Sequence, residues 1–276
     1  MGMAPRLKGL SAVYAVVPEG FGEVMDILVT GRPETVMRDL AGLGYGGVEL
    51  NIADPFRFDP STYRRLARSN GLEIAAISTG LSRALLGVSL AHPVEGVRRR
   101  SLEAFKRYIE VASQLDSEVV VVGIARGSCG GDCGGARERL RASLETLSDL
   151  AKSYGVVLAV EPINRYEIDL VNTVGEALDL IEGLDSTGLL VDTFHSTLEE
   201  PSPYQAVVEA GGRMVHLHVA DSNRRAPGLG IIDWARIARA LRRVGYAGYA
   251  SVEARVMPDY RGQLEIAART LSALLE

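Results

Sequence analysis

The chain has 276 residues, a net charge of −5 and an apolar content of 47%. This is enough apolar material for a full hydrophobic core, and single barrels commonly reach this length. The excess of acidic groups argues against a general nucleic-acid or membrane-surface binder, because binding to phosphates needs a basic face. No apolar run approaches the roughly 18 residues of a membrane span.

The apolar run near the N-terminus follows Arg6 and Lys8 and could imitate a short signal peptide. It is brief, however, and Pro18 and Gly20 end it as a loop would, so we interpret it as a first strand. With two cysteines and no signal peptide, the sequence favours a cytoplasmic protein.

Short runs rich in Val, Ile and Leu alternate along the chain with loops and amphipathic stretches. Eight such runs cover residues 11–17, 47–52, 73–78, 118–124, 156–161, 188–192, 214–220 and 249–254. Between them, apolar positions recur every three or four residues, as in 99–115 and 137–155, which predicts helices. Near-continuous apolar strands are typical of parallel sheets buried on both faces.

Eight strand–helix units in this length average about 34 residues each, the size of a βαβ repeat. We therefore predict an α/β fold, a (β/α)8 TIM barrel that forms a single domain over residues 1–276. A doubly wound open sheet is the competing fold, although no G-x-G-x-x-G follows the first strand. The glycine-rich stretch 127–135 is predicted to be a loop after strand four, in which Cys129 and Cys133 are equally compatible with a disulfide and with free thiols.

Four consecutive predicted strands carry an ionisable residue at or near their C-terminal ends. These residues are Glu161, Asp192, His218 and Glu253. In a barrel they would meet at one mouth, where enzymes of this fold build their active sites. Three carboxylates and an imidazole resist being buried together, and a divalent cation resolves the repulsion. Oxygen-rich ligation with one imidazole suits Mn²⁺, Mg²⁺ or Co²⁺.

Other polar residues surround these positions. His195 follows Asp192 by three residues, and Arg224 lies in the loop after strand seven. His216 is two residues from His218 and therefore on the same face, where we favour a hydrogen-bonded supporting role over metal binding. Glu49, near the end of strand two, is expected to form hydrogen bonds within the site or within the barrel.

The motifs VEPINRYE, VDTFH, HLHVADSNRRAPGLGIIDW and SVEA resemble the xylose-isomerase-like barrels of the sugar isomerase and epimerase group, and most closely the ketose 3-epimerases. The resemblance implies one bound divalent metal ion, Mn²⁺ above Mg²⁺ or Co²⁺. By this resemblance the metal ligands are Glu161, Asp192, His218 and Glu253, the acid–base pair is Glu161 and Glu253, and the substrate-binding residues are Glu167, His195 and Arg224.

The implied reaction inverts C3 of a free ketose through a cis-enediolate, with one carboxylate on each face of the substrate. The expected partner is therefore a small ketose, with neither nucleic acid nor a membrane, and the family implies a homo-oligomer, either a dimer or a tetramer. Two alternatives share the metal chemistry. One is a related isomerase or epimerase, hydroxypyruvate isomerase-like, inosose dehydratase-like or specific for a sugar phosphate. In such an enzyme Arg126 could contact a distal group of the substrate, although a surface salt bridge fits Arg126 equally well.

The other alternative is an endonuclease IV-type nuclease. Its three-zinc site requires more histidines than the four in this chain.

Overall fold

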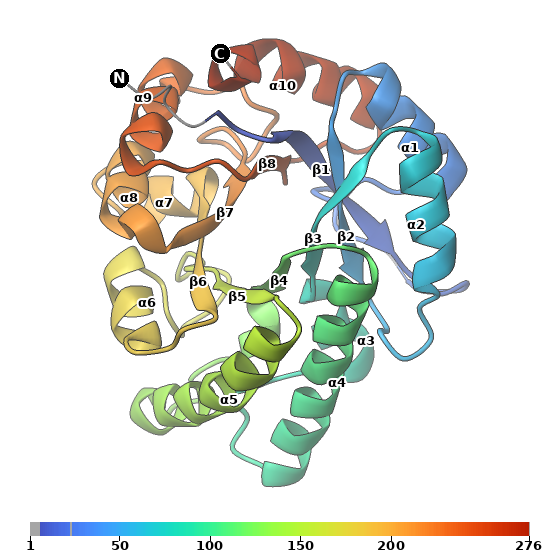
Figure 1. Ribbon diagram of the computed structural model, residues 1–276. Helices are drawn as coiled ribbons and strands as arrows, with labels where there is room; N and C mark the ends of the chain where they lie inside the picture. The colour runs from blue at the N-terminus through green and yellow to red at the C-terminus, as the bar shows by residue number, and fades with distance from the viewer. Residues whose placement is uncertain (1–5, 23, 276) are drawn as a thin grey trace.

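The computed structural model describes residues 6–22 and 24–275. Its strands are all parallel and follow chain order around a closed barrel, in which β8 pairs with β1 (Figure 1). The strands are β1 (Gly9–Val16), β2 (Gly47–Ile52), β3 (Glu73–Ser78), β4 (Val119–Val122), β5 (Val157–Val160), β6 (Thr187–Asp192), β7 (Met214–Val219) and β8 (Tyr249–Val252). The pairing of β1 with β8 confirms the predicted (β/α)8 barrel and excludes the open sheet.

The helices surround the barrel (Figure 1). They are α1 (Pro33–Gly42), α2 (Pro60–Ser69), α3 (Gly80–Leu86), α4 (Glu95–Gln114), α5 (Cys133–Ser153), α6 (Val174–Ile181), α7 (Thr193–Glu199), α8 (Pro203–Ala210), α9 (Trp234–Val244) and α10 (Tyr260–Leu275). None of the helices in the described part of the chain combines the length and the apolar character needed to cross a membrane.

The helices predicted over 99–115 and 137–155 correspond to α4 and α5, each of which begins four residues earlier than expected. For α5 the reason is a cap, because the Asp132 carboxylate accepts a hydrogen bond from Gly135 N at 2.9 Å. The prediction of a loop over the whole of 127–135 is therefore wrong for its last three residues, which form the first turn of α5.

Successive side chains of each strand point alternately into the barrel and outward, into the core beneath the helices. Leu50 of β2 and Leu217 of β7 point outward and belong to the main hydrophobic core. Their neighbours Glu49, His216 and His218 lie inside the barrel and are fully buried, at 0–1% exposure. The barrel therefore buries a polar layer beneath its mouth, and the strand pattern decides which residues enter it.

Several strands end earlier than the apolar runs suggested. Strand β4 ends at Val122, because a short 3₁₀ turn follows Gly123. Glu161 and Glu253 each stand one residue beyond β5 and β8, while Asp192 is the last residue of β6. These shifts leave the predicted arrangement intact, since all the strand ends still open at one mouth.

Arg126, in the turn after β4, is buried completely and faces inward. Its guanidinium donates hydrogen bonds to three backbone carbonyls, those of Gly123 at 3.0 Å, Leu170 at 2.7 Å and Val171 at 2.9 Å. Burial lowers the pKa of Arg126 to about 10. The expectations of a substrate contact or a surface salt bridge are therefore wrong: this arginine joins the loop after β4 to the loop after β5.

Cys129 and Cys133 form a disulfide, which decides between the two states that the sequence left open. The backbone N–H of Cys129 also donates a hydrogen bond to the carboxylate of Asp169 at 2.7 Å. The disulfide thus ties the start of α5 to a segment that itself contacts the loop after β5.

Candidate functional site

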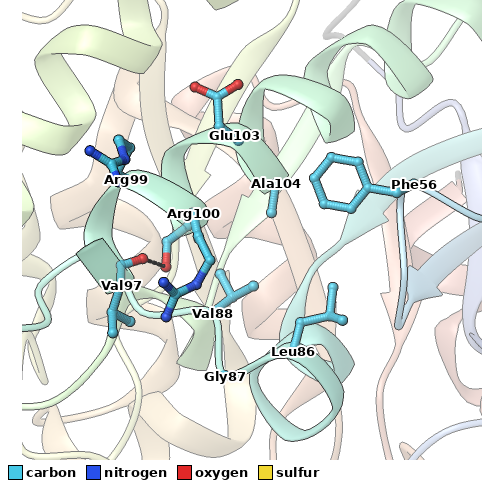
Figure 2. A pocket seen from close by; sticks show the side chains of 10 residues that line it. Phe56, Leu86, Gly87, Val88, Val97, Arg99, Arg100, Glu103 and Ala104 are labelled. Atoms are coloured by element: carbon cyan, nitrogen blue, oxygen red, sulfur yellow. Dashed lines mark hydrogen bonds between the residues drawn. The ribbon is translucent and has the colours of Figure 1, made fainter. Parts of the chain in front are cut away.

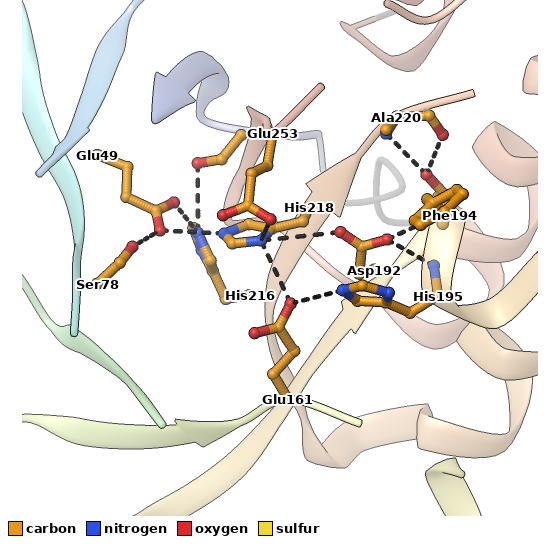
Figure 3. Close-up of polar contacts among 12 residues, drawn as sticks. Glu49, Ser78, Glu161, Asp192, Phe194, His195, His216, His218, Ala220 and Glu253 are labelled. Carbon is orange, nitrogen blue, oxygen red and sulfur yellow. Dashed lines mark hydrogen bonds and ion pairs between the residues drawn. The ribbon is translucent and has the colours of Figure 1, made fainter. Parts of the chain in front are cut away.

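The four predicted strand-end residues converge at the mouth of the barrel. His218 Nδ1 lies 3.6 Å from Glu161 Oε1, 3.9 Å from Asp192 Oδ2 and 3.7 Å from Glu253 Oε2. Figure 3 shows the Glu161 and Glu253 carboxylates approaching the His218 ring from opposite sides. The four candidate ligand atoms all lie within 4.8 Å of one another.

The opposite nitrogen of His218 is held by Glu49. His218 Nε2 lies 3.0 Å from Glu49 Oε1, and His216 Nε2 lies 2.7 Å from the other oxygen of the same carboxylate. Ser78 Oγ also donates a hydrogen bond to Glu49. With Nε2 donating to Glu49, the Nδ1 of His218 faces the three other carboxylates (Figure 3). His216 is thus hydrogen-bonded to Glu49, the arrangement favoured for it from the sequence.

Two overlapping groups of described side chains could bind a cation: Glu49 with His216 and His218, and the four strand-end residues. In the first group the imidazole nitrogens already form short hydrogen bonds to Glu49. In the second, His218 Nδ1 and Glu161 Oε1 are buried without any hydrogen-bond partner. Buried polar atoms normally have partners, so these two atoms mark where a ligand belongs.

The donor set of the second group fits a divalent cation. Atoms that share an ion at about 2.1 Å lie roughly 3 to 4 Å apart, as the atoms around His218 Nδ1 do. A metal-binding histidine usually donates its other ring N–H to a carboxylate, and Glu49 accepts in this way from His218. The strand-end group is therefore the candidate divalent-metal site.

Asp192 links this site to α7. Its Oδ1 caps the helix by accepting hydrogen bonds from Phe194 N at 2.7 Å and His195 N at 2.9 Å. Its Oδ2 faces His218. One carboxylate thus fixes both the position of His195 and one corner of the candidate metal site.

Burial and crowding perturb the pKa values of these groups. Burial, with repulsion from Glu161, raises the pKa of Asp192 to about 7. Burial also raises the pKa of Glu161, and its interaction with His218 reduces this effect only in part. Burial alone would lower the pKa of His218, but the negative charges of Glu49 and Glu253 hold it well above its ordinary value. Without a cation, the site therefore keeps protons that a cation would displace.

Arg224 and Glu167 form an ion pair across the mouth. The guanidinium contacts the Glu167 carboxylate, lies 3.9 Å from Glu253 and stacks 4.9 Å from the centre of the Phe194 ring. Arg224 has a φ of 60°, which is costly for a residue with a side chain. Its carbonyl accepts a hydrogen bond from Arg255 N at 2.7 Å, which helps to hold this conformation.

His195 is oriented by a residue that sequence reasoning missed. Asn164 Nδ2 lies 2.8 Å from His195 Nδ1 and 2.9 Å from Glu167 Oε1. Because the amide nitrogen is a donor, His195 Nδ1 must accept, and the ring proton sits on Nε2, 3.9 Å from Glu161. Burial, and then the charge of Arg224, lower the pKa of His195 and keep the ring neutral. The signal was present, since Asn164 stands inside the VEPINRYE motif.

These side chains line one cavity of about 270 Å³ at the mouth. It contains Glu161, Glu167, His195, His218, Arg224 and Glu253. A larger cavity of about 520 Å³ lies between α3, the start of α4 and the loop after β2 (Figure 2). That cavity is lined by residues such as Phe56 and Arg100 and by none of the candidate ligands. The chemistry is therefore concentrated in the smaller cavity.

Comparison with known proteins agrees with this architecture. The profile of the family described as "Xylose isomerase-like TIM barrel" matches residues 37–274. The chain belongs to this family. A solved structure, "Structure of L-ribulose 3-epimerase", shares the barrel fold with a TM-score of 0.83. It is 23% identical over 97% of this chain and 94% of the other, a likeness that bears on the fold alone.

Curated relatives of the family extend the comparison to sequence. A "D-psicose 3-epimerase" of Enterocloster bolteae is 35% identical over 58% of this chain and 55% of its own length. The match therefore spans little more than half of that relative. A "Ketose 3-epimerase" of Arthrobacter globiformis is 29% identical over 74% of this chain and 71% of its own length. The relatives with these names are isomerases, in agreement with the resemblance found in the motifs.

The raised pKa of Asp192 predicts how the metal-free protein responds to pH. Because this pKa is higher in the folded than in the unfolded chain, Asp192 contributes most to stability at low pH, and that contribution is lost as pH rises toward 7. In EDTA, Asp192→Asn should therefore melt several degrees above the wild type at pH 8. The difference should narrow toward pH 5 in calorimetric scans.

The exposed Asp149 of α5 provides the control. Asp149→Asn should change the melting temperature little, and equally at both pH values. An Asp192→Asn protein that melts below the wild type at pH 8 would contradict the predicted repulsion.

Proposed function

We propose that this protein is a divalent-metal-dependent ketose 3-epimerase that inverts C3 of a free ketose. In this proposal Glu161, Asp192, His218 and Glu253 bind one cation. The observation that carries the proposal is the pair of carboxylates, Glu161 from β5 and Glu253 from β8, on opposite sides of the unpartnered His218 Nδ1 (Figure 3). Two carboxylates facing each other across one substrate position can serve its two faces, as an inversion requires.

When bound, the cation would act as a Lewis acid that polarises the ketose carbonyl and acidifies the neighbouring C–H. The protein must then move a proton. In the proposal one carboxylate of the pair takes the C3 proton from one face of the sugar, and the other returns a proton to the opposite face.

Glu167, His195 and Arg224 would bind the substrate. His195 presents a ring N–H toward the cavity, because Asn164 occupies its other nitrogen. Arg224 offers a guanidinium beside Glu253, and Glu167 offers a carboxylate that can accept from a sugar hydroxyl. Donors placed where negative charge develops on the substrate oxygens would stabilise the enediolate.

The named activities of the relatives support this choice. Their names include ketose 3-epimerase, D-psicose 3-epimerase and L-ribulose 3-epimerase. A nuclease of the endonuclease IV type fits less well. Among the chain's four histidines, His92 stands apart from the mouth in the loop before α4, where its Nδ1 accepts a hydrogen bond from Val94 N at 3.1 Å.

The identity of the cation, the assembly and the location stay predictions. We propose Mn²⁺, with Mg²⁺ and Co²⁺ as alternatives, because the donor set has three oxygens and one nitrogen. A homo-oligomer, either a dimer or a tetramer, and a cytoplasmic location are likewise expected.

Metal binding should stabilise the protein measurably. Adding Mn²⁺ at about 100 times its dissociation constant should contribute ~2.7 kcal/mol to the free energy of unfolding. Thermal scans of EDTA-treated protein with added Mn²⁺, Mg²⁺ or Co²⁺ would measure the stabilisation and rank the ions. Electron paramagnetic resonance would count bound Mn²⁺. A protein that binds less than one Mn²⁺ per chain and whose melting temperature is unchanged would refute the metal site.

Solvent deuterium should identify the reacting carbon. We expect metal-loaded protein in D₂O to convert fructose to psicose, or tagatose to sorbose, with deuterium appearing at C3 in NMR spectra. Exchange at C1 would instead indicate aldose–ketose isomerisation. Turnover of a phosphate ester without exchange in any free ketose would favour the sugar-phosphate alternative.

The catalytic role proposed for the paired glutamates can be tested without disturbing the fold. Glu253→Gln is expected to lower the epimerisation rate by roughly 10² to 10⁴, the usual contribution of a proton-transfer group, and to leave the circular dichroism spectrum unchanged. Glu265→Gln is the matched control, because Glu265 lies on the exposed face of α10 and, among the described residues, its ion-pair partner is Arg269. Near-wild-type activity of Glu253→Gln would remove Glu253 from the proposed pair. Mn²⁺ titration of the same variant would separate loss of metal from loss of the base.

A further inference from the structure

The mouth cavity has a second wall that the proposed reaction does not use. It is contributed largely by the first four strands and their loops and includes Met25, Ile27, Asn51, Gly80 and Ile124. Most of this wall is apolar. The hydroxyls that line it are already committed, because Ser78 donates to Glu49 and Thr79 donates to Val121 O at 2.8 Å.

Asn51 is the exception on this wall. It lies on β2 two residues beyond Glu49, hence on the same inward face but nearer the mouth, and is only 5% exposed. Its Oδ1 accepts a hydrogen bond from Leu81 N at 3.1 Å. Since a backbone N–H must face the amide oxygen, this contact fixes which way the amide points.

The amide nitrogen of Asn51 is left with unused donors. In the described part of the chain, Nδ2 makes no hydrogen bond to protein, yet it is not sealed off as the buried unpartnered atoms are. It faces Gly80, where even an added Cβ would come within 3.5 Å of it. Gly80 carries no side chain, and both residues line the cavity, so the space beside Nδ2 belongs to the cavity.

The charges of the cavity restrict what can approach this donor. Arg224 is the only arginine or lysine among the described residues that line it, and Arg224 is already paired with Glu167. Its other charged lining groups are the carboxylates and histidines of the candidate site. With the proposed cation held by its four ligands and Arg224 paired, the described lining leaves no free positive group at this wall for a phosphate, whereas an uncharged hydroxyl needs only one donor.

We propose that Asn51 is a specificity-determining residue, whose Nδ2 donates a hydrogen bond to a hydroxyl on carbon 4, 5 or 6 of an unphosphorylated ketose. The carbon chain of the sugar lies against Met25, Ile27 and Ile124. This inference rests on the proposed epimerase function and adds to it the residue that recognises the far end of the neutral sugar, through a single amide.

A cycle of paired deletions tests the contact, with one change in the protein and one in the sugar. The protein variants are Asn51→Asp, which keeps an oxygen for Leu81 N but loses the donor, and Asn51→Leu, which loses both. The sugars are fructose and its 4-deoxy, 5-deoxy and 6-deoxy analogues. Differences in the open-chain fraction of each sugar cancel, because the same sugars meet every protein.

The wild type should prefer fructose over one of the three analogues by about 5-fold to 10-fold in kcat/KM, the size of one neutral hydrogen bond. Both Asn51 variants should reduce that one preference to within about 2-fold and leave the other two ratios unchanged. Calorimetric dissociation constants of the metal-loaded proteins should follow the same pattern. Fructose 6-phosphate should bind the wild type at least about 10-fold more weakly than fructose does.

Ser82→Ala is the matched control. Ser82 lies on α3 next to Leu81, the residue that bonds Asn51, but Ser82 does not line the cavity, and its Oγ donates to Thr79 O at 2.7 Å. It should leave all the sugar ratios as in the wild type. Asn51 variants that lower kcat/KM for every sugar by the same factor would show a purely structural role and overturn the inference. Epimerisation by the wild type with unchanged ratios in both variants would overturn this inference alone. A wild type that turns over no ketose would overturn the proposed function and this inference with it.

Discussion

A single buried imidazole, that of His218, organises the mouth of this barrel. An imidazole can offer a lone pair to a cation only when its other nitrogen carries the proton. Glu49 accepts at that other nitrogen, and His216 and Ser78 hold Glu49 in turn. These partners lie one layer deeper in the barrel, where the side chains are buried and a hydrogen bond to a charged group is strong. The site above depends on this layer, because it decides which nitrogen of His218 faces the carboxylates.

The loops above the barrel are fixed by polar contacts in addition to the apolar packing of residues such as Val171 and Ala226. Asp221, which is fully buried, accepts hydrogen bonds from Ser222 N, Gly228 N and Trp234 Nε1, and so closes the loop after β7 on itself. The same loop holds Arg224 in its left-handed conformation. Strain of this kind survives only where the surroundings impose it, and here it places a guanidinium over the mouth.

The loop after β5 is held by hydrogen bonds from Arg126 and from its own Asn164. Arg126 binds two of its carbonyls from the buried turn after β4. Within the loop, Asn164 contacts Glu167, and it also reaches His195 on α7. A buried arginine without a carboxylate partner is costly, and three carbonyl acceptors offset that cost. The result is a rigid platform, in which residues far from the reacting position determine where the polar groups of the mouth stand.

Much of the fold and of the candidate site can be predicted from the sequence, because strands and helices depend on interactions between residues close together in the chain. Runs of β-branched residues predict the strands, and apolar residues at helical spacing predict the helices that surround them. Residues at the C-terminal ends of the strands must then meet at one mouth once the barrel closes. The sequence alone therefore predicts that Glu161, Asp192, His218 and Glu253 lie together. The partners of Glu49, the inward turn of Arg126, the role of Asn164 and the disulfide were decided only by the tertiary structure. Each depends on contacts between segments far apart in the sequence, which the spacing of apolar residues does not predict. Each also depends on which of several nearby groups becomes the hydrogen-bond partner of a buried polar atom.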